Sequence, residues 1–149
     1  DDIETIHAAT DLLAEAKLSP ELRNEALYYR AKAYTKQKAD KKAMEDYREL
    51  AKDTRNSYGA EAKYQVAQSL YDAKEYAAAE KELLNYIEQS TPHAYWLARS
   101  FILLSDVYHA TGKDLDARQY LLSLQQNYQG NDDIESMIES RLSKLKVEN

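Results

Sequence analysis

One pattern of small and apolar residues occurs three times in the chain, and this repetition limits the possible fold more than any other feature. Each copy begins with a small residue, which is followed after three positions by a tyrosine or leucine and after twelve positions by an alanine. The small residues are Ala31, Ala67 and Ser105, and the alanines are Ala43, Ala79 and Ala117. Each alanine is followed by two apolar residues at the fourth and seventh positions: Tyr47 and Leu50, Leu83 and Tyr86, Leu121 and Leu124. Because small residues let two helix axes approach closely, the pattern predicts three antiparallel helix pairs.

The composition also favours an all-α chain. Only three glycines and two prolines occur among 149 residues, and strong helix formers are abundant. Apolar periodicity and start signals predict eight helices, near 2–17, 21–37, 40–53, 58–73, 76–89, 92–111, 114–128 and 131–146. Thr91–Pro92 and Asn131 are interpreted as helix starts. The increased spacing between Ala79 and Ser105 predicts an unusually long sixth helix.

The predicted helices form a single array of helix pairs. Residues 1–18 correspond to the second helix of a truncated repeat, because Ala9, Leu13 and Ala16 lie 34 positions before Ala43, Tyr47 and Leu50. Three full repeats are expected at 21–54, 57–90 and 92–129, and a capping helix at 131–146. The unmatched first helix predicts an array that continues before residue 1. We also expect it to expose Ile3, Ile6 and Leu13, and to allow self-association.

The cap is predicted from an apolar stripe in the last segment. Its members, expected to cover the third repeat, are Ile134, Met137, Ile138, Leu142 and Leu145.

Several classes of function are disfavoured by the composition. The net charge of −6, from 20 Lys and Arg against 26 Asp and Glu, argues against a nucleic-acid partner. The chain has no cysteine, so thiolate metal sites and thiol nucleophiles are excluded. No long apolar run predicts a membrane span. Metal-binding motifs and glycine-rich phosphate loops are absent from the sequence, so no cofactor is expected.

The best candidate for a catalytic group is the cluster of Ser105, Asp106 and His109, which share one predicted helix. Ser105, however, is a small residue at a predicted helix crossing, and its hydroxyl is expected to bond a carbonyl of its own helix. No oxyanion-forming turn accompanies it. We therefore expect no enzymatic activity.

The repeated pattern resembles the tetratricopeptide repeat, whose ideal period is 34 residues. The resemblance covers residues 24 to about 128, and Gly112 and Tyr76 fall at positions that this family favours. Arg30 and Lys63 depart from it, because the family prefers apolar residues there. The resemblance implies a right-handed α-α solenoid of antiparallel helix pairs, with about three and a half repeats and a C-terminal capping helix.

In this family, the first helices of successive repeats form a concave binding groove. The positions implied here are Glu25, Tyr28, Lys32, Thr35, Glu61, Tyr64, Gln68, Tyr71, Arg99, Ile102, Asp106 and His109. In the alternative interpretation, Tyr64 and Tyr71 only pack against neighbouring repeats. A clamp for a C-terminal carboxylate is not expected, because Lys32 is the single cation at the relevant positions of the first two repeats.

The implied function is a scaffold that binds a protein or peptide segment in this groove to assemble a complex. The alternative is a structural spacer within a larger protein, without a dedicated ligand. Repeats of 36 to 38 residues are similar to the bacterial envelope branch of the family, which includes the lipoprotein subunit of the β-barrel assembly machinery. This similarity favours a periplasmic or outer-membrane-associated location, with a cytoplasmic location as the alternative.

Overall fold

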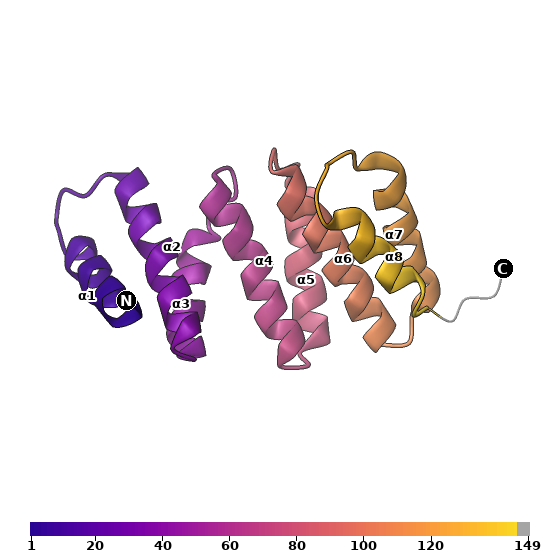
Figure 1. The fold of residues 1–149 in the computed structure, drawn as a ribbon, viewed down its shortest axis with the longest axis horizontal. Coiled ribbons are helices and arrows are strands. Elements are labelled where there is room, and N and C mark those ends of the chain that lie inside the picture. The colour runs from indigo at the N-terminus through magenta and orange to yellow at the C-terminus, as the bar shows by residue number, and fades with distance from the viewer. Residues whose placement is uncertain (146–149) are drawn as a thin grey trace. The chain divides into compact units, whose positions relative to one another are not determined.

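The computed structural model describes residues 1–145, and this part of the chain contains eight α-helices and no β-strand (Figure 1). The helices are α1 (Asp2–Leu13), α2 (Pro20–Lys36), α3 (Asp40–Leu50), α4 (Ser57–Asp72), α5 (Tyr76–Glu88), α6 (Ala94–Ala110), α7 (Asp114–Asn127) and α8 (Ile134–Leu142). The chain consists of two compact units, one spanning Asp1–Val66 and the other beginning at Ala67. In the first unit α2 packs against α1 and α3. In the second unit α6 packs against α5, α7 and α8.

The all-α class and the order of the eight helices are confirmed, but several helix ends differ from the prediction. The first helix ends at Leu13, before the expected end at residue 17. The last helix spans Ile134–Leu142, shorter than the expected 131–146, and position 146 lies outside the described residues. The prediction of an unusually long sixth helix is wrong, because α6 and α2 both have 17 residues. The additional length lies mainly in α5, which has 13 residues where α3 has 11.

Local hydrogen bonds explain where the helices start. The Ser19 hydroxyl accepts a hydrogen bond from the Leu22 amide at 3.2 Å, so the serine caps α2 just before Pro20. Thr91 does not cap α6, because its hydroxyl accepts hydrogen bonds from the His93 amide and from the Tyr86 hydroxyl. The start predicted at Thr91–Pro92 is therefore wrong.

The start predicted at Asn131 is also wrong. The Asp132 carboxylate accepts a hydrogen bond from the Ile134 amide at 3.0 Å, and α8 begins at Ile134 with Asp133 in the capping position.

The turns inside the three helix pairs have the same geometry. Lys38, Lys74 and Gly112 adopt left-handed backbone conformations, with φ values of 58°, 61° and 80°. The residue after each one donates its amide proton to a carbonyl five positions earlier. These bonds are Ala39 to Tyr34 at 2.9 Å, Glu75 to Leu70 at 2.9 Å and Lys113 to Tyr108 at 2.8 Å. This is the hydrogen bond of a Schellman motif, and it ends the first helix of each pair at the same point of the repeat.

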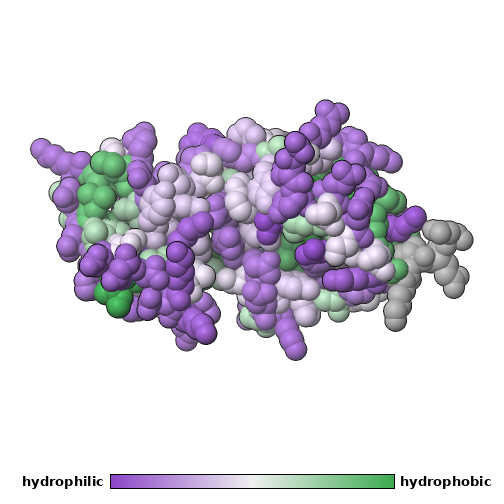
Figure 2. Space-filling model, viewed as in Figure 1, coloured by the Kyte–Doolittle hydropathy of each residue, from purple (hydrophilic) through white to green (hydrophobic). Residues whose placement is uncertain are grey.

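The small residues of the repeated pattern lie in the core, as predicted. Ala31, Ala67 and Ser105 are at most 1% exposed. The second-helix positions of the pattern are also buried: Ala43, Ala79, Ala117, Tyr47, Leu83, Leu121, Leu50, Tyr86 and Leu124. The surface in Figure 2 is mostly hydrophilic, but hydrophobic residues gather over α1.

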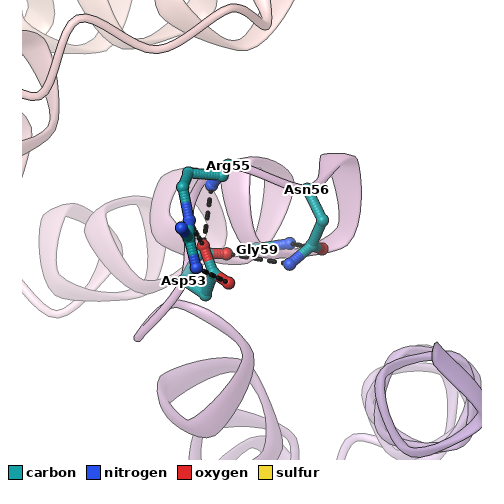
Figure 3. A network of polar contacts seen from close by, with 4 residues as sticks. All are labelled: Asp53, Arg55, Asn56 and Gly59. Atoms are coloured by element: carbon teal, nitrogen blue, oxygen red, sulfur yellow. Dashed lines mark hydrogen bonds and ion pairs between the residues drawn. The ribbon is translucent and has the colours of Figure 1, made fainter. Parts of the chain in front are cut away.

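The connection between α3 and α4 depends on a glycine (Figure 3). A Cβ atom at Gly59 would lie 2.8 Å from the carbonyl oxygen of Leu50 and would also collide with the carbonyl of Asp53. The Asn56 side chain accepts a hydrogen bond from the Gly59 amide at 2.9 Å and donates one to the Asp53 carbonyl at 3.0 Å. Asn56 thus caps α4 while the glycine lets the two backbones approach closely.

The last helix closes the core of the second unit. Ile134 and Ile138 are buried in one cluster with Leu121, Leu124 and Ile102. Met137, Leu142 and Leu145 pack against this cluster, so all five residues of the predicted apolar stripe contact the core.

We predict that Lys38→Gly and Lys74→Gly each raise the free energy of unfolding, by about 0.5 to 1 kcal/mol. Glycine removes the steric cost of the left-handed conformation, and part of this gain is offset by the greater entropy of the unfolded chain. Chemical denaturation would measure both variants, with Lys41→Gly inside α3 as the matched control. The control should lower stability, because glycine is unfavourable within a helix. A lower free energy of unfolding in either glycine variant would contradict the steric cost assigned here to a left-handed lysine.

Candidate functional site

Three of the predicted groove residues form one polar cluster in the first unit. The Tyr28 hydroxyl donates a hydrogen bond to the Glu61 carboxylate at 2.8 Å. The Lys32 ammonium lies 3.7 Å from the other carboxylate oxygen of Glu61 and 5.0 Å from the centre of the Tyr28 ring. The Tyr28 ring also packs against Tyr58, with 4.6 Å between ring centroids, and against Tyr29 at 5.3 Å. We call these five residues, Tyr28, Tyr29, Lys32, Tyr58 and Glu61, the tyrosine cluster.

The electrostatics of the tyrosine cluster keep Tyr28 neutral and Lys32 charged. Burial raises the pKa of Tyr28; Lys32 opposes this rise, while the carboxylate of Glu61 adds to it. The contact with the Tyr28 hydroxyl raises the pKa of Lys32, and Glu61 adds to this effect. The Lys32 side chain remains 47% exposed, so the cluster presents aromatic rings and a cation to solvent.

Two further predicted residues of this unit, Glu25 and Thr35, lie on α2 together with Tyr28 and Lys32. Glu25 is exposed. The Thr35 hydroxyl donates a hydrogen bond to the Ala31 carbonyl at 3.0 Å, so it is used within its own helix.

In the second unit, Asp106 and Tyr71 are associated with the last helix. Arg141 of α8 donates hydrogen bonds to the Asp106 carboxylate at 3.2 and 3.4 Å. Burial raises the pKa of Asp106, while Arg141 lowers it. Tyr71 is near enough to the Asp106 charge for its own pKa to be raised by it, although burial has the larger effect. The sequence did not indicate Arg141 as a partner of a groove residue.

The remaining polar residues predicted in the second unit bond to near neighbours in sequence. Gln68 donates to Asp72 at 2.8 Å, and His109 lies 2.8 Å from Asp114. Arg99 donates a hydrogen bond to the Tyr95 hydroxyl at 2.9 Å. These pairs each stabilise one helix or one turn.

Two predicted groove residues have buried side chains. Tyr64 is 5% exposed and Ile102 is 1% exposed, and Ile102 belongs to the core cluster closed by α8. In the first unit, the rings that pack beside Tyr28 are instead those of Tyr58 and Tyr29, which were not predicted. The position of Tyr58, three residues before Glu61, was the available signal, because residues three apart share a helix face.

The residues of the candidate catalytic cluster have separate partners. The Ser105 hydroxyl donates to the Ile102 carbonyl at 2.7 Å, as expected for a serine inside a helix. Asp106 binds Arg141, and His109 binds Asp114. In the described part of the chain, no group of three His, Asp or Glu side chains is placed to hold a metal ion. Within the same residues, no helix has the length and apolar character needed to cross a membrane.

Arg30, which departs from the repeated pattern, has a buried acidic partner. Its guanidinium donates two hydrogen bonds to the Asp46 carboxylate, at 2.8 and 2.7 Å, and one to the Thr10 hydroxyl at 3.1 Å. Asp46 is 4% exposed, and its hydrogen bonds raise the pKa of Arg30. One side chain of α2 thereby joins α1 and α3.

We predict that Arg30→Met lowers the free energy of unfolding by about 3 kcal/mol, because it leaves the Asp46 carboxylate buried without its cation. The double variant Arg30→Met with Asp46→Leu should recover most of this loss. Chemical denaturation would measure both. Arg23→Met removes an exposed ion pair with Glu49 and serves as the control, with little expected change. Equal losses in the single and double variants would contradict the buried-charge explanation.

Comparison of the chain with protein families, with curated proteins and with solved structures finds no match.

Proposed function

We propose that the chain is a helical-repeat scaffold of the tetratricopeptide type that binds a protein or peptide segment. The observation that carries the proposal is the threefold recurrence of one turn, at Lys38, Lys74 and Gly112. Each recurrence is accompanied by a buried small residue seven positions earlier: Ala31, Ala67 and Ser105. Helix pairs that repeat in this way favour a right-handed α-α solenoid of about three and a half repeats, with α8 as its cap.

The tyrosine cluster is the part of the scaffold best suited to contact a partner. Tyrosine gives a large contact area and loses little side-chain entropy, and aromatic residues are enriched at binding surfaces. Lys32 adds a cation beside the rings, which can meet a carboxylate of the partner. A binding role is favoured over a catalytic one, because the most suggestive polar residues, Ser105, Asp106 and His109, bond to separate partners.

The radius of gyration distinguishes a solenoid from a compact domain. A compact domain of this length has a radius of gyration of about 15 Å. We expect small-angle X-ray scattering to give a value well above this, at concentrations where light scattering shows a monomer. A monomer whose radius of gyration is close to the compact value would contradict the solenoid.

If the tyrosine cluster binds a partner, two charge reversals should differ in how much partner protein they capture. Lys32→Glu changes the tyrosine cluster, and Lys41→Glu makes the same change on the exposed surface of α3. Each variant of the 149-residue chain would be immobilised and exposed to an extract of the cells that produce the protein. Mass spectrometry should show at least one protein captured by the wild type and by Lys41→Glu, and reduced about tenfold by Lys32→Glu.

Thermal melts provide the control. Lys32→Glu replaces the contact with Glu61 by a like-charge pair and should melt a few degrees below the wild type, but both variants should remain folded at the temperature of the capture experiment. If the three proteins capture the same partners in equal amounts, the cluster is not a binding surface. The chain would then be better described as a spacer.

A further inference from the structure

The turn between α2 and α3 (Figure 1) carries more positive charge than the two turns that share its geometry. Residues 30–42 contain six lysines and arginines and one aspartate. The equivalent residues 66–78 contain one lysine and two acidic residues, and residues 104–116 contain one lysine and three aspartates. All three turns close with the same hydrogen bond, at 2.8 or 2.9 Å, so closing the turn does not require this charge.

Helix stability does not explain the charge either. Lys42 lies in the first turn of α3, where the partial positive charge of the helix end disfavours a cation. The equivalent residues of α5 and α7 are Ala78 and Asp116, and an acidic side chain is the one that this end of a helix favours. Lys38 adopts a left-handed conformation that glycine would adopt at lower energy. Only Lys36, in the last turn of α2, lies where the helix dipole favours a cation.

Three of these cations have no acidic partner. Lys36, Lys38 and Lys42 are exposed, and in the described part of the chain none of them lies within ion-pair distance of a carboxylate. The start of α1 borders them, because the Asp2 carboxylate accepts a hydrogen bond from the Gln37 side chain at 3.3 Å. We call the three lysines the basic patch.

An aromatic ring lies beside the basic patch. The Lys42 ammonium is 5.8 Å from the centre of the Tyr34 ring, and the Arg30 guanidinium lies at the same distance. Arg30 is neutralised by Asp46, to which it donates two hydrogen bonds. A ligand of the basic patch would therefore meet uncompensated ammonium groups next to a half-buried ring.

The charge of the remaining chain decides which kind of anion fits this patch. Outside residues 30–42 the sequence has 14 lysines and arginines against 25 acidic residues. A membrane surface or a nucleic acid extends far beyond three lysines, so it would also face these acidic residues and be repelled by them. A short acidic segment can lie within about 8 Å of the lysines, the distance over which physiological salt screens a charge.

We propose that the basic patch binds a short acidic segment of a partner protein, whose carboxylates pair with Lys36, Lys38 and Lys42. An apolar side chain of the segment packs on the Tyr34 ring. This surface is separate from the tyrosine cluster, and it does not depend on the binding role proposed for that cluster.

A labelled acidic peptide tests the proposal with the 149-residue chain. The probe is fluorescein-labelled octaglutamate, and fluorescence anisotropy should show saturable binding. Affinity should fall about tenfold in the triple variant Lys36→Gln, Lys38→Gln and Lys42→Gln. The matched control has the same net charge and removes exposed lysines elsewhere: Lys74→Gln, Lys81→Gln and Lys113→Gln. This control should bind the probe within about twofold of the wild type.

Nuclear magnetic resonance locates the bound probe on the unmodified sequence. Titration of octaglutamate into the isotope-labelled chain should shift the amide resonances of residues 34–43. The equivalent residues 70–79 and 108–117 have the same turn geometry without the excess of lysine, so their resonances should not shift.

Four results would overturn the proposal. The first is no saturable binding of octaglutamate at millimolar chain concentration, and the second is equal affinity of the two triple variants. The third is a shift of amide resonances at all three turns. The fourth is tighter binding of phosphatidylserine vesicles or of a DNA duplex than of the peptide, since the patch would then serve a membrane or a nucleic acid. None of these measurements alters Lys32, so a failure here is distinct from a failure of the capture experiment.

Discussion

The hydrogen bond that closes each left-handed turn is the constraint on which the rest of the structure depends. It ends the first helix of a pair at a fixed residue and reverses the chain within a few positions. The small residue seven positions before the turn and the alanine five positions after it then enter the core together, as Ala31 and Ala43 do on either side of Lys38. Leucines and tyrosines at the following helical positions are buried because this first contact fixes the rotation of both helices.

The all-α class, the number of helices and most buried positions could be predicted from the sequence, because they depend on spacing alone. Helix ends could not, because single side chains decide them. The Thr91 hydroxyl is held in its loop by a bond from Tyr86, which enters the core from α5, and no local pattern reveals this. The end of α1 at Leu13 was also missed. Its apolar residues continue to Ala16, but Ala14, Glu15 and Ala16 are exposed.

The candidate site was predicted in part. Tyr28, Lys32 and Glu61 lie together because they occupy predicted groove positions on α2 and α4 and face one another between these helices. The repeat position of Tyr28 also predicted Tyr64 and Ile102 at the groove, and both of these side chains are buried. A helical position indicates a direction from the axis, and the neighbouring elements decide whether that direction leads to solvent. Asp106 shows this dependence, since α8 supplies the Arg141 that bonds it.

The two turn lysines, Lys38 and Lys74, have a consequence for proteolysis of the chain. Lys38 and Lys74 are exposed at the tips of two turns, where a protease that cleaves after lysine would meet them first. Cleavage requires an extended segment, which the turn provides only after its closing hydrogen bond and the adjacent helix ends have opened. The rate of cutting at each lysine therefore reports how often that helix pair opens, and trypsin becomes a local probe of stability within the intact chain.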